Sequence, residues 1–316
     1  MSPAQRPEVV VITGASSGIG RETARAYAHR GARLVLASRS RAALETVAGE
    51  CRALGARTLV VPTDVSRETE VEALAAAAVA QYGRIDVWVG NAGVFAYGSF
   101  EELPAGVFRQ VVETNLMGQI HGARAALPYF RRQGKGALVL VGSLYSRVGS
   151  PAVSPYVTGK FGLLGFAECL RQELRGSGIR VRIVLPATID TPIYGHAANV
   201  TGRRVRPLPP TAAPARVARA IVRSPGRRRF AAPVGRMQMW VIPVHDLAPG
   251  LYDRIASVLM HRVELHGAGP VTLGTVLEPS GAADQTTGGW RSNGLRLLLG
   301  GAVAATLAAL VAARHR

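Results

Sequence analysis

Short apolar segments alternate with longer Ala-rich segments along the first 187 residues. The short segments are nearly continuous in Val, Ile and Leu, which is typical of parallel strands that helices cover on both faces. The predicted strands span residues 8–14, 33–39, 57–65, 85–93, 136–143 and 179–187. The longer segments have helical length, and several of them end at a Gly. The predicted helices span residues 19–31, 41–55, 68–83, 105–134 and 154–178.

This alternation predicts the fold class. A strand, a helix and a second strand in succession form a right-handed crossover between parallel neighbours. We therefore expect an α/β domain in which a doubly wound parallel sheet lies between two helical layers, a three-layer αβα arrangement. We also expect a helical tail at the C-terminus.

The pattern changes after Pro186. Residues 187–212 are rich in Pro, Gly and Arg and predict a mobile loop that would act as a substrate lid. A helix near 213–223, a short strand near 229–232 and a helix over 247–263 would complete the domain. We expect one catalytic domain over 1–265, a flexible linker over 266–294 and a hydrophobic helix over 295–316.

The hydrophobic tail allows more than one interpretation. The stretch Leu297–Ala313 carries no charge, and arginines flank it. Its helical length of about 25 Å is at the short end for a membrane span. The first interpretation is a membrane anchor for a cytoplasmic catalytic domain, with a lipophilic substrate. The alternatives are a hairpin-like interfacial insertion, or a soluble helix whose Leu and Val residues pack on the domain or on a second subunit.

Composition narrows the classes of partner and of site. The net charge of +18 would suit a phosphorylated ligand, an anionic membrane surface or nucleic acid. The arginines are spread along the chain, however, and no nucleic-acid-binding motif occurs, so we expect no nucleic-acid partner. The two cysteines and the scattered histidines lack metal-ligand spacing. We therefore expect neither a metal site nor a disulfide, and a reducing compartment.

A Gly-rich loop, TGASSGIG, runs from Thr13 to Gly20 between the first predicted strand and the first helix. Glycines let a backbone approach a pyrophosphate closely, and the helix N-terminus offers unpaired N–H groups to its charge. The alternative is an ordinary strand–helix turn. The loop residues expected to bind a dinucleotide are Gly14, Ser16, Ser17, Gly18, Ile19 and Gly20.

The end of the second predicted strand bears on which dinucleotide is bound. An acidic residue there would select an unphosphorylated ribose, but this chain has Arg39. A guanidinium pairs well with a 2′-phosphate, so we expect NADP(H) rather than NAD(H). The alternative is that Arg39 is one more surface charge in an Arg-rich chain.

Tyr156 and Lys160 stand four residues apart, on one face of a predicted helix. Only two of the 38 basic residues are lysines, Lys135 and Lys160. An ammonium about 5 Å away, at an effective dielectric of about 20, favours a phenolate by roughly 3 kcal/mol, or about two pKa units. We therefore predict that Lys160 lowers the pKa of Tyr156 toward the range of a general acid/base. A plain surface pair is the alternative.

Residues 8–265 resemble the short-chain dehydrogenase/reductases, which are single-domain Rossmann-fold oxidoreductases. The resemblance rests on the Gly-rich loop, on "YVTGK" at Tyr156–Lys160 and on further motifs in a fixed order. These are "DV" at Asp64–Val65, "NAG" at Asn91–Gly93, Asn115 in "ETNLMG", Ser143 in "VGSLYS" and "PATIDTP" at Pro186–Pro192. Gly90 stands where many relatives have Asn, and Ala187 where Gly is usual.

The resemblance implies a role for each matching residue. Tyr156 would be the catalytic acid/base, and Lys160 would tune its pKa and bind the nicotinamide ribose. Ser143 would hold the substrate oxygen, and Asn115 would hold a water that relays protons. The further residues expected to contact the cofactor are Asp64, Val65, Asn91, Ala92, Gly93, Pro186, Thr188 and Thr191.

The function that these features predict is an NADP(H)-dependent oxidoreductase that interconverts a carbonyl and a secondary alcohol. The resemblance further implies a homodimer or a homotetramer. The alternative is a cofactor-bound scaffold or redox sensor without catalysis. Phe95, Tyr97 and Tyr145 could line a substrate pocket, or could equally be core aromatics.

Overall fold

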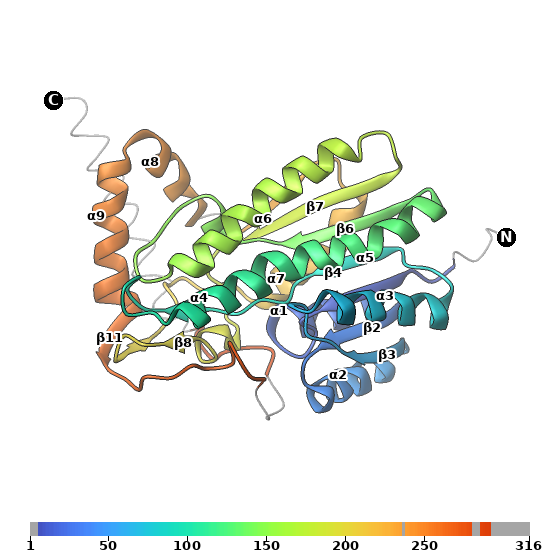
Figure 1. The fold of residues 1–316 in the computed structure, drawn as a ribbon, viewed down its shortest axis with the longest axis horizontal. Coiled ribbons are helices and arrows are strands. Elements are labelled where there is room, and N and C mark those ends of the chain that lie inside the picture. Colours follow the sequence, from blue (N-terminus) through green and yellow to red (C-terminus); the bar gives the residue numbers. More distant parts are fainter. Residues whose placement is uncertain (1–5, 236–237, 280–284, 292–316) are drawn as a thin grey trace.

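The computed structural model describes residues 6–235, 238–279 and 285–291. A seven-stranded sheet forms the centre of the molecule, and every pair of neighbouring strands in it is parallel. The strand order is β3-β2-β1-β4-β6-β7-β10 (Figure 1). The bounds are β1 Val9–Thr13, β2 Arg33–Ser38, β3 Arg57–Pro62, β4 Val87–Gly90, β6 Gly136–Val141, β7 Ile179–Pro186 and β10 Ala231–Val234. This confirms the predicted doubly wound sheet.

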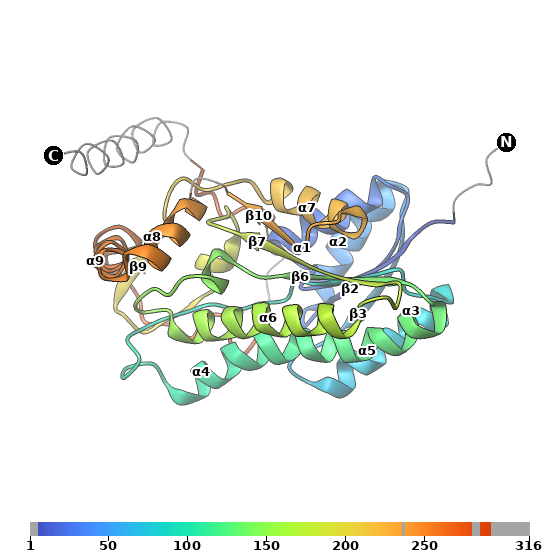
Figure 2. The same ribbon diagram turned by 90° about the horizontal axis from the view of Figure 1, so that it is seen from above.

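Helices cover both faces of the sheet, as Figure 2 shows edge-on. On one face lie α1 Gly18–Ala28, α2 Arg41–Ala53 and α7 Pro214–Arg223. On the other lie α3 Glu68–Tyr82, α4 Ala105–Val112, α5 Gly118–Gln133 and α6 Ser154–Glu173. Because successive strand side chains point to opposite faces, Val10 and Ile12 enter one core while Val11 enters the other. Two apolar cores therefore stabilise the three layers.

The strand order changes direction between β1 and β4. From β1 the chain adds β2 and β3 on one side, and later β6, β7 and β10 beyond β4 on the other. Loops that leave two neighbouring strands in opposite directions open a crevice at the carboxyl ends, and ligands bind in such crevices. The Gly-rich loop after β1 and the segment after β4 meet at this point.

The predicted loop over 187–212 contains ordered elements. A 3₁₀ turn spans Pro192–Tyr194, and β8 Ala198–Asn199 pairs in parallel with β5 Ala96–Tyr97. Strand β9 Arg203–Val205 pairs antiparallel with β11 Leu265–Ala268. These pairings give a few main-chain groups of the segment hydrogen-bond partners elsewhere in the domain. The segment is thus a loop that contains short paired elements, and its mobility stays a prediction.

The C-terminal part of the domain gathers at one end of the sheet (Figure 1). It contains α8 Val241–Leu247, α9 Pro249–Leu259 and a π-helical turn, Met260–Glu264. The described part of the predicted linker, 266–279 and 285–291, begins within β11 and includes the fully buried Val276. Val276 belongs to an apolar cluster of the domain. The flexibility of the linker as a whole stays a prediction.

The predicted tail helix over 295–316, and with it the proposed membrane contact, lies outside the described residues. Among the helices that the structure does describe, none combines the length and the apolar character that a bilayer crossing requires.

Candidate active site

The Gly-rich loop between β1 and α1 is braced by residues that follow β4. The hydroxyl of Thr13 accepts hydrogen bonds from the N–H groups of Asn91, at 3.1 Å, and Ala92, at 3.2 Å. The Asn91 carboxamide donates to the carbonyls of Thr13 and Gly14, each at 3.0 Å. Asn91 therefore shapes the cradle through its side chain.

Close approach of backbone explains the glycines of this loop. Gly14 has a φ of +64°, and a Cβ there would lie 2.7 Å from the Cα of Ala92. A Cβ on Gly20 would lie 2.0 Å from the carbonyl oxygen of Gly14. Real Cβ atoms do not tolerate such distances, so only glycine keeps this turn tight and open to a ligand.

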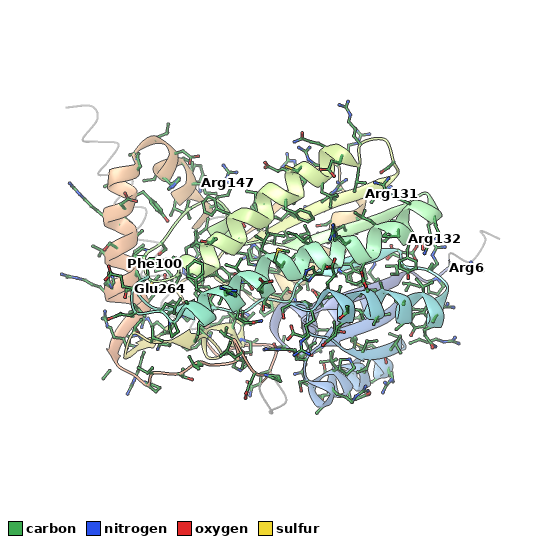
Figure 3. All side chains as sticks on the ribbon, viewed as in Figure 1. Arg6, Phe100, Arg131, Arg132, Arg147 and Glu264 are labelled. Atoms are coloured by element: carbon green, nitrogen blue, oxygen red, sulfur yellow. The ribbon has the colours of Figure 1, made fainter. Side chains whose placement is uncertain are left out.

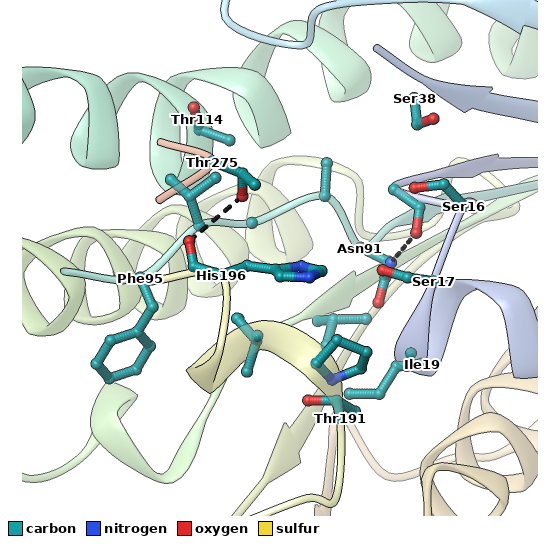
Figure 4. A pocket seen from close by; sticks show the side chains of 18 of the residues that line it. Ser16, Ser17, Ile19, Ser38, Asn91, Phe95, Thr114, Thr191, His196 and Thr275 are labelled. Carbon is teal, nitrogen blue, oxygen red and sulfur yellow. Dashed lines mark hydrogen bonds between the residues drawn. The ribbon is translucent and has the colours of Figure 1, made fainter. Parts of the chain in front are cut away.

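A cavity runs from the cradle to the predicted catalytic residues. Figure 4 shows part of its lining, including Ser16 and Ser17 of the cradle. It brings together residues from the carboxyl ends of β1, β2, β3, β4, β6 and β7. Gly20, Asn115 and Thr188, which the sequence placed in the site, do not line it. The predicted residues that do line it are Gly14, Ser16, Ser17, Gly18, Ile19, Arg39, Asp64, Val65, Asn91, Ala92, Gly93, Ser143, Tyr156, Lys160, Pro186 and Thr191.

Arg39 lies at the end of the cavity that is remote from Tyr156. Its guanidinium donates hydrogen bonds to the main-chain carbonyls of Thr275, at 2.5 Å, and Leu277, at 3.2 Å. Partial burial lowers the pKa of Arg39, and the nearby Asp64 carboxylate opposes that shift. Arg39 is therefore a half-buried cation held by neutral carbonyl groups.

Tyr156 and Lys160 lie on α6, four residues apart, and both are buried. The Lys160 ammonium lies 5.5 Å from the centre of the Tyr156 ring and donates to the carbonyl of Val141, at 2.8 Å. Removal from water disfavours both charged forms. Burial raises the pKa of Tyr156 to about 12, although a hydrogen bond with Ser143 opposes the shift. Burial lowers the pKa of Lys160 to about 8.

The predicted lowering of the Tyr156 pKa is therefore wrong for this structure. The Coulomb argument treated the pair as partly solvated, whereas the cost of desolvation is the larger effect on a phenol that is only 8% exposed. The neutral phenol that results can still donate a proton, and the adjacent Ser143 can share it.

Ser143 lies between β6, which ends at Val141, and a short 3₁₀ turn, Leu144–Ser146. Its hydroxyl accepts a hydrogen bond from the Tyr145 N–H, at 3.1 Å, and its own N–H donates to the Ser146 hydroxyl, at 3.2 Å. This reciprocal cap orients the Ser143 side chain toward Tyr156. The serine and the phenol thus face the same point of the cavity.

Asn115 lies in a π-helical turn, Glu113–Met117, that interrupts the predicted helix over 105–134. Its Oδ1 accepts from the Val94 N–H, at 2.8 Å, and its Nδ2 donates to the Val94 carbonyl, at 2.9 Å. Both polar atoms of the fully buried side chain are thereby used. Each atom keeps one further donor or acceptor position, so the role of Asn115 in holding a water stays a prediction.

A family model described as short chain dehydrogenase matches residues 8–199, which is more than half of the chain. The chain belongs to the short-chain dehydrogenase/reductase family. It is an oxidoreductase of the class that acts on CH–OH groups with NAD or NADP. Described residues contain no group of three or more His, Cys, Asp or Glu side chains that could hold a metal ion.

Three relatives place this short-chain dehydrogenase/reductase among known proteins. It is 34% identical to an uncharacterized oxidoreductase of Bacillus subtilis, YxnA, over 81% of this chain and 73% of the relative. A Burkholderia phymatum short-chain dehydrogenase/reductase in complex with NAD has a TM-score of 0.70 at 28% identity, over 78% and 95% of the two chains. A Thermococcus sibiricus alcohol dehydrogenase complexed with 5-hydroxy-NADP has a TM-score of 0.63 at 28% identity, over 72% and 95%.

The site of this short-chain dehydrogenase/reductase includes residues that the sequence did not indicate. Thr275 and Pro279 line the cofactor end of the cavity, and the Thr275 hydroxyl donates to the His196 carbonyl, at 3.4 Å (Figure 4). The N–H of Gly18, in the Gly-rich loop, donates to the carbonyl of Gln285, at 3.2 Å. These contacts join residues at least 79 positions apart, so no local pattern could reveal them.

Thr188 and Thr191, which were both expected to contact the cofactor, have different surroundings. Thr191 lines the cavity, beside Gly18. Thr188 instead exchanges two hydrogen bonds with Gln238: its N–H donates to Oε1, at 3.2 Å, and its hydroxyl accepts from Nε2, at 3.0 Å. Gln238 also donates to the carbonyls of Leu208 and Pro210, and so it anchors the segment after β7.

Proposed function

We propose that this short-chain dehydrogenase/reductase interconverts a carbonyl and a secondary alcohol with NADP(H), and that Tyr156 is its acid/base. The observation that carries the proposal is one continuous cavity. Ser143, Tyr156 and Lys160 meet at one end of it, and the Gly-rich cradle and Arg39 lie at the other. A dinucleotide that spans this cavity would bring its nicotinamide next to Tyr156.

The chain's own residues fit such a dinucleotide. Gly14 and Gly18 keep the cradle free of side-chain atoms, and both have positive φ angles. Ser17 caps α1 without a hydrogen bond from its side chain, so its hydroxyl could receive a pyrophosphate together with the N–H groups that follow Gly18 in the first turn of α1. The N–H of Gly18 itself would first have to leave the Gln285 carbonyl. When bound, the nicotinamide supplies a hydride for reduction or accepts one in oxidation.

The charge at Arg39 supports a preference for NADP(H). Its guanidinium is bound to carbonyl oxygens, which are neutral, and a 2′-phosphate would offer it a stronger, charge-assisted partner. The Asp64 carboxylate near Arg39 already has partners, since its Oδ1 accepts from the N–H and the hydroxyl of Ser66. Arg39 is therefore the residue on which this preference depends.

In reduction, the Ser143 hydroxyl would hold the substrate carbonyl oxygen and stabilise the charge that develops on it. The Tyr156 phenol, neutral because its pKa is raised, would donate its proton to that oxygen. The Lys160 ammonium, 5.5 Å from the ring, would stabilise the phenolate that remains. In oxidation, the same residues would act in the reverse direction.

A catalytic assay tests the proposal. Purified protein is mixed with NADPH and a panel of aldehydes, ketones and sterol ketones, and oxidation of NADPH is followed. We expect turnover of at least one class, and loss of about a hundredfold or more in Tyr156→Phe with unchanged NADPH binding. Bound NADPH without turnover of any carbonyl would contradict the proposal and would favour a scaffold or sensor.

A further inference from the structure

A second cavity extends from the catalytic residues away from the cofactor end. It shares Ser143 and Tyr156 with the first cavity, and Ile193 and Tyr194 stand between the two. Most of its wall is apolar or aromatic. The residues that line only this second cavity include Tyr97, Tyr145, Val148, Tyr252, Leu259 and Glu264. Because it lies beside Tyr156, this cavity could hold the part of a substrate that extends away from the reacting carbon.

Glu264 is the one carboxylate in the wall of this second cavity. It is the last residue of the π-helical turn that connects α9 to β11 (Figure 3). Glu264 is only 6% exposed. Within the described part of the chain, no Lys, Arg or His forms an ion pair with it. Burial alone raises its pKa to about 8.

Burying an ionised carboxyl group without a cation costs folding free energy, because the charge loses its hydration and gains no partner. Proteins normally pair such groups or leave them in water. The groups around Glu264 are tyrosines that reach it from several elements. They are Tyr97 on β5, Tyr145 after β6, Tyr194 after β7 and Tyr252 on α9. Burial is the main cause that raises the pKa of each, and the Glu264 charge adds to it. None of these phenols can neutralise a carboxylate, so among the described residues the acid lines a cavity without a counter-charge.

Tyr97 is a second polar group in this wall, independent of Glu264. Its side chain is fully buried, and its hydroxyl has no hydrogen-bond partner among the residues that the structure describes. Buried hydroxyl groups nearly always find a partner, so an orphaned one in a cavity wall points to a polar atom of a ligand. Tyr97 and Glu264 thus give this largely apolar cavity two buried polar groups.

We propose that Glu264, assisted by Tyr97, selects carbonyl or alcohol substrates that carry a second polar group, a hydrogen-bond donor, away from the reacting carbon. The proposal rests on the proposed function, since it assigns the far end of the same substrate. The apolar and aromatic wall would pack against the carbon skeleton. A substrate hydroxyl or amine would donate to the Glu264 carboxyl group, and the rings around it would also favour an ammonium.

The test compares ketones that share one skeleton. The probes are 4-methylcyclohexanone, 4-hydroxycyclohexanone and 4-aminocyclohexanone, which are similar in size and differ only in the donor. Binding to the protein saturated with NADP⁺ is measured by calorimetry, and kcat/KM is measured with NADPH. We expect the wild type to favour the hydroxyl or the amino probe over the methyl probe by about tenfold or more.

Two substitutions at one position separate charge from hydrogen bonding. Glu264→Leu should make the three probes equivalent. Glu264→Gln keeps an acceptor oxygen, so it should retain a preference for the hydroxyl probe and lose a preference for the amino probe. Glu72→Gln, at an exposed position of α3, is the matched control and should behave as the wild type. If Glu264→Leu does not fold, Glu264→Gln still tests whether the preference for the amino probe depends on the charge of Glu264.

The outcomes distinguish this proposal from the proposed function. A donor preference in binding that disappears in Glu264→Leu supports the role of Glu264 even if no probe is reduced, in which case the proposed catalysis alone fails. Reduction of all three probes with equal kcat/KM leaves the catalysis intact and overturns the role of Glu264. Failure of every probe to bind, or a donor preference that survives in Glu264→Leu, also overturns it.

Discussion

The guanidinium of Arg39 donates a hydrogen bond of 3.2 Å to the main-chain carbonyl of Leu277, which lies 238 residues further along the chain. The contact closes the C-terminal segment over the part of the cavity that would receive the adenosine end of a cofactor. A residue predicted to bind phosphate is thus also a structural contact of the segment after β11. Binding of a 2′-phosphate and this contact would draw on the same donors.

Arg39→Leu should weaken NADPH binding much more than NADH binding. Loss of a charge-assisted hydrogen bond to phosphate costs about 1.5–3 kcal/mol, or roughly ten- to a hundredfold in Kd. Fluorescence titration with both nucleotides measures the two constants. Arg228→Leu, at an exposed position outside the cavity, is the control and should change neither constant. Equal weakening for both nucleotides would refute the assignment of the 2′-phosphate to Arg39.

The rate of carbonyl reduction should fall as the pH rises through about 8. Burial lowers the pKa of Lys160 to about 8, so its ammonium is present below that pH and is lost above it. Tyr156, with a pKa raised to about 12, remains a proton donor throughout this range. The measurement is a profile of kcat/KM from pH 6 to pH 10.

Lys160→Met provides the control for this profile. It should be slow and flat across the range, because it has no ammonium to lose. A decline near pH 8 that persists in Lys160→Met would mean that another group titrates.

Asn115→Ala should destabilise the protein. The N–H and the carbonyl of Val94 would lose their buried partners, at a cost of about 1–3 kcal/mol for each orphaned group. Urea unfolding measures the loss. Glu113→Ala, in the same π-helical turn but partly exposed, is the matched control and should cost less than about 0.5 kcal/mol. Equal stability of the two variants would show that the Asn115–Val94 pair contributes nothing.

Glu264→Gln should stabilise the protein at pH 8.5 relative to wild type, but much less at pH 5. The pKa of Glu264 is raised from 4.5 to about 8, so the folded state binds its proton more tightly than the unfolded state does. The stability that this provides is fully present below pH 4.5 and is lost as the pH rises through about 8.

The neutral Gln avoids that loss, and the difference in unfolding free energy should grow by about 2–4 kcal/mol between pH 5 and pH 8.5. The four surrounding tyrosines have raised pKa values and stay neutral over this range. The titration of Lys160 is common to both proteins and cancels in the difference. Urea unfolding at the two pH values measures the effect, and a constant difference would contradict it.

Local patterns were sufficient for most of the fold and for naming the residues that we propose to be catalytic. The strands and helices up to β7 follow from apolar runs and terminal glycines, because a strand buried on both faces needs a continuous apolar sequence. The Gly-rich loop and the pair Tyr156 and Lys160 could be read from spacing, because strand–turn–helix geometry and the helical repeat place these residues predictably. Fold class and family were accordingly correct.

The direction of the Tyr156 pKa shift could not be read from spacing. Sequence distance predicts the separation of Tyr156 and Lys160, but not how far the surrounding layers exclude water from them. Burial raises one pKa and lowers the other, and it depends on side chains such as Phe95, whose ring centre lies 4.1 Å from that of Tyr156. Whether Phe95 and Tyr97 belonged to a core or to a pocket was open for the same reason.

By itself the sequence determined the order of strands and helices, the Gly-rich cradle and the set Ser143, Tyr156 and Lys160, since each depends on residues that are near neighbours in the chain. Only the tertiary structure decided that the segment after β11 contacts Arg39 and Gly18, and that Glu264 faces the cavity beside Tyr156. These contacts depend on how distant segments pack together. Such packing leaves no pattern in the spacing of residues along the sequence.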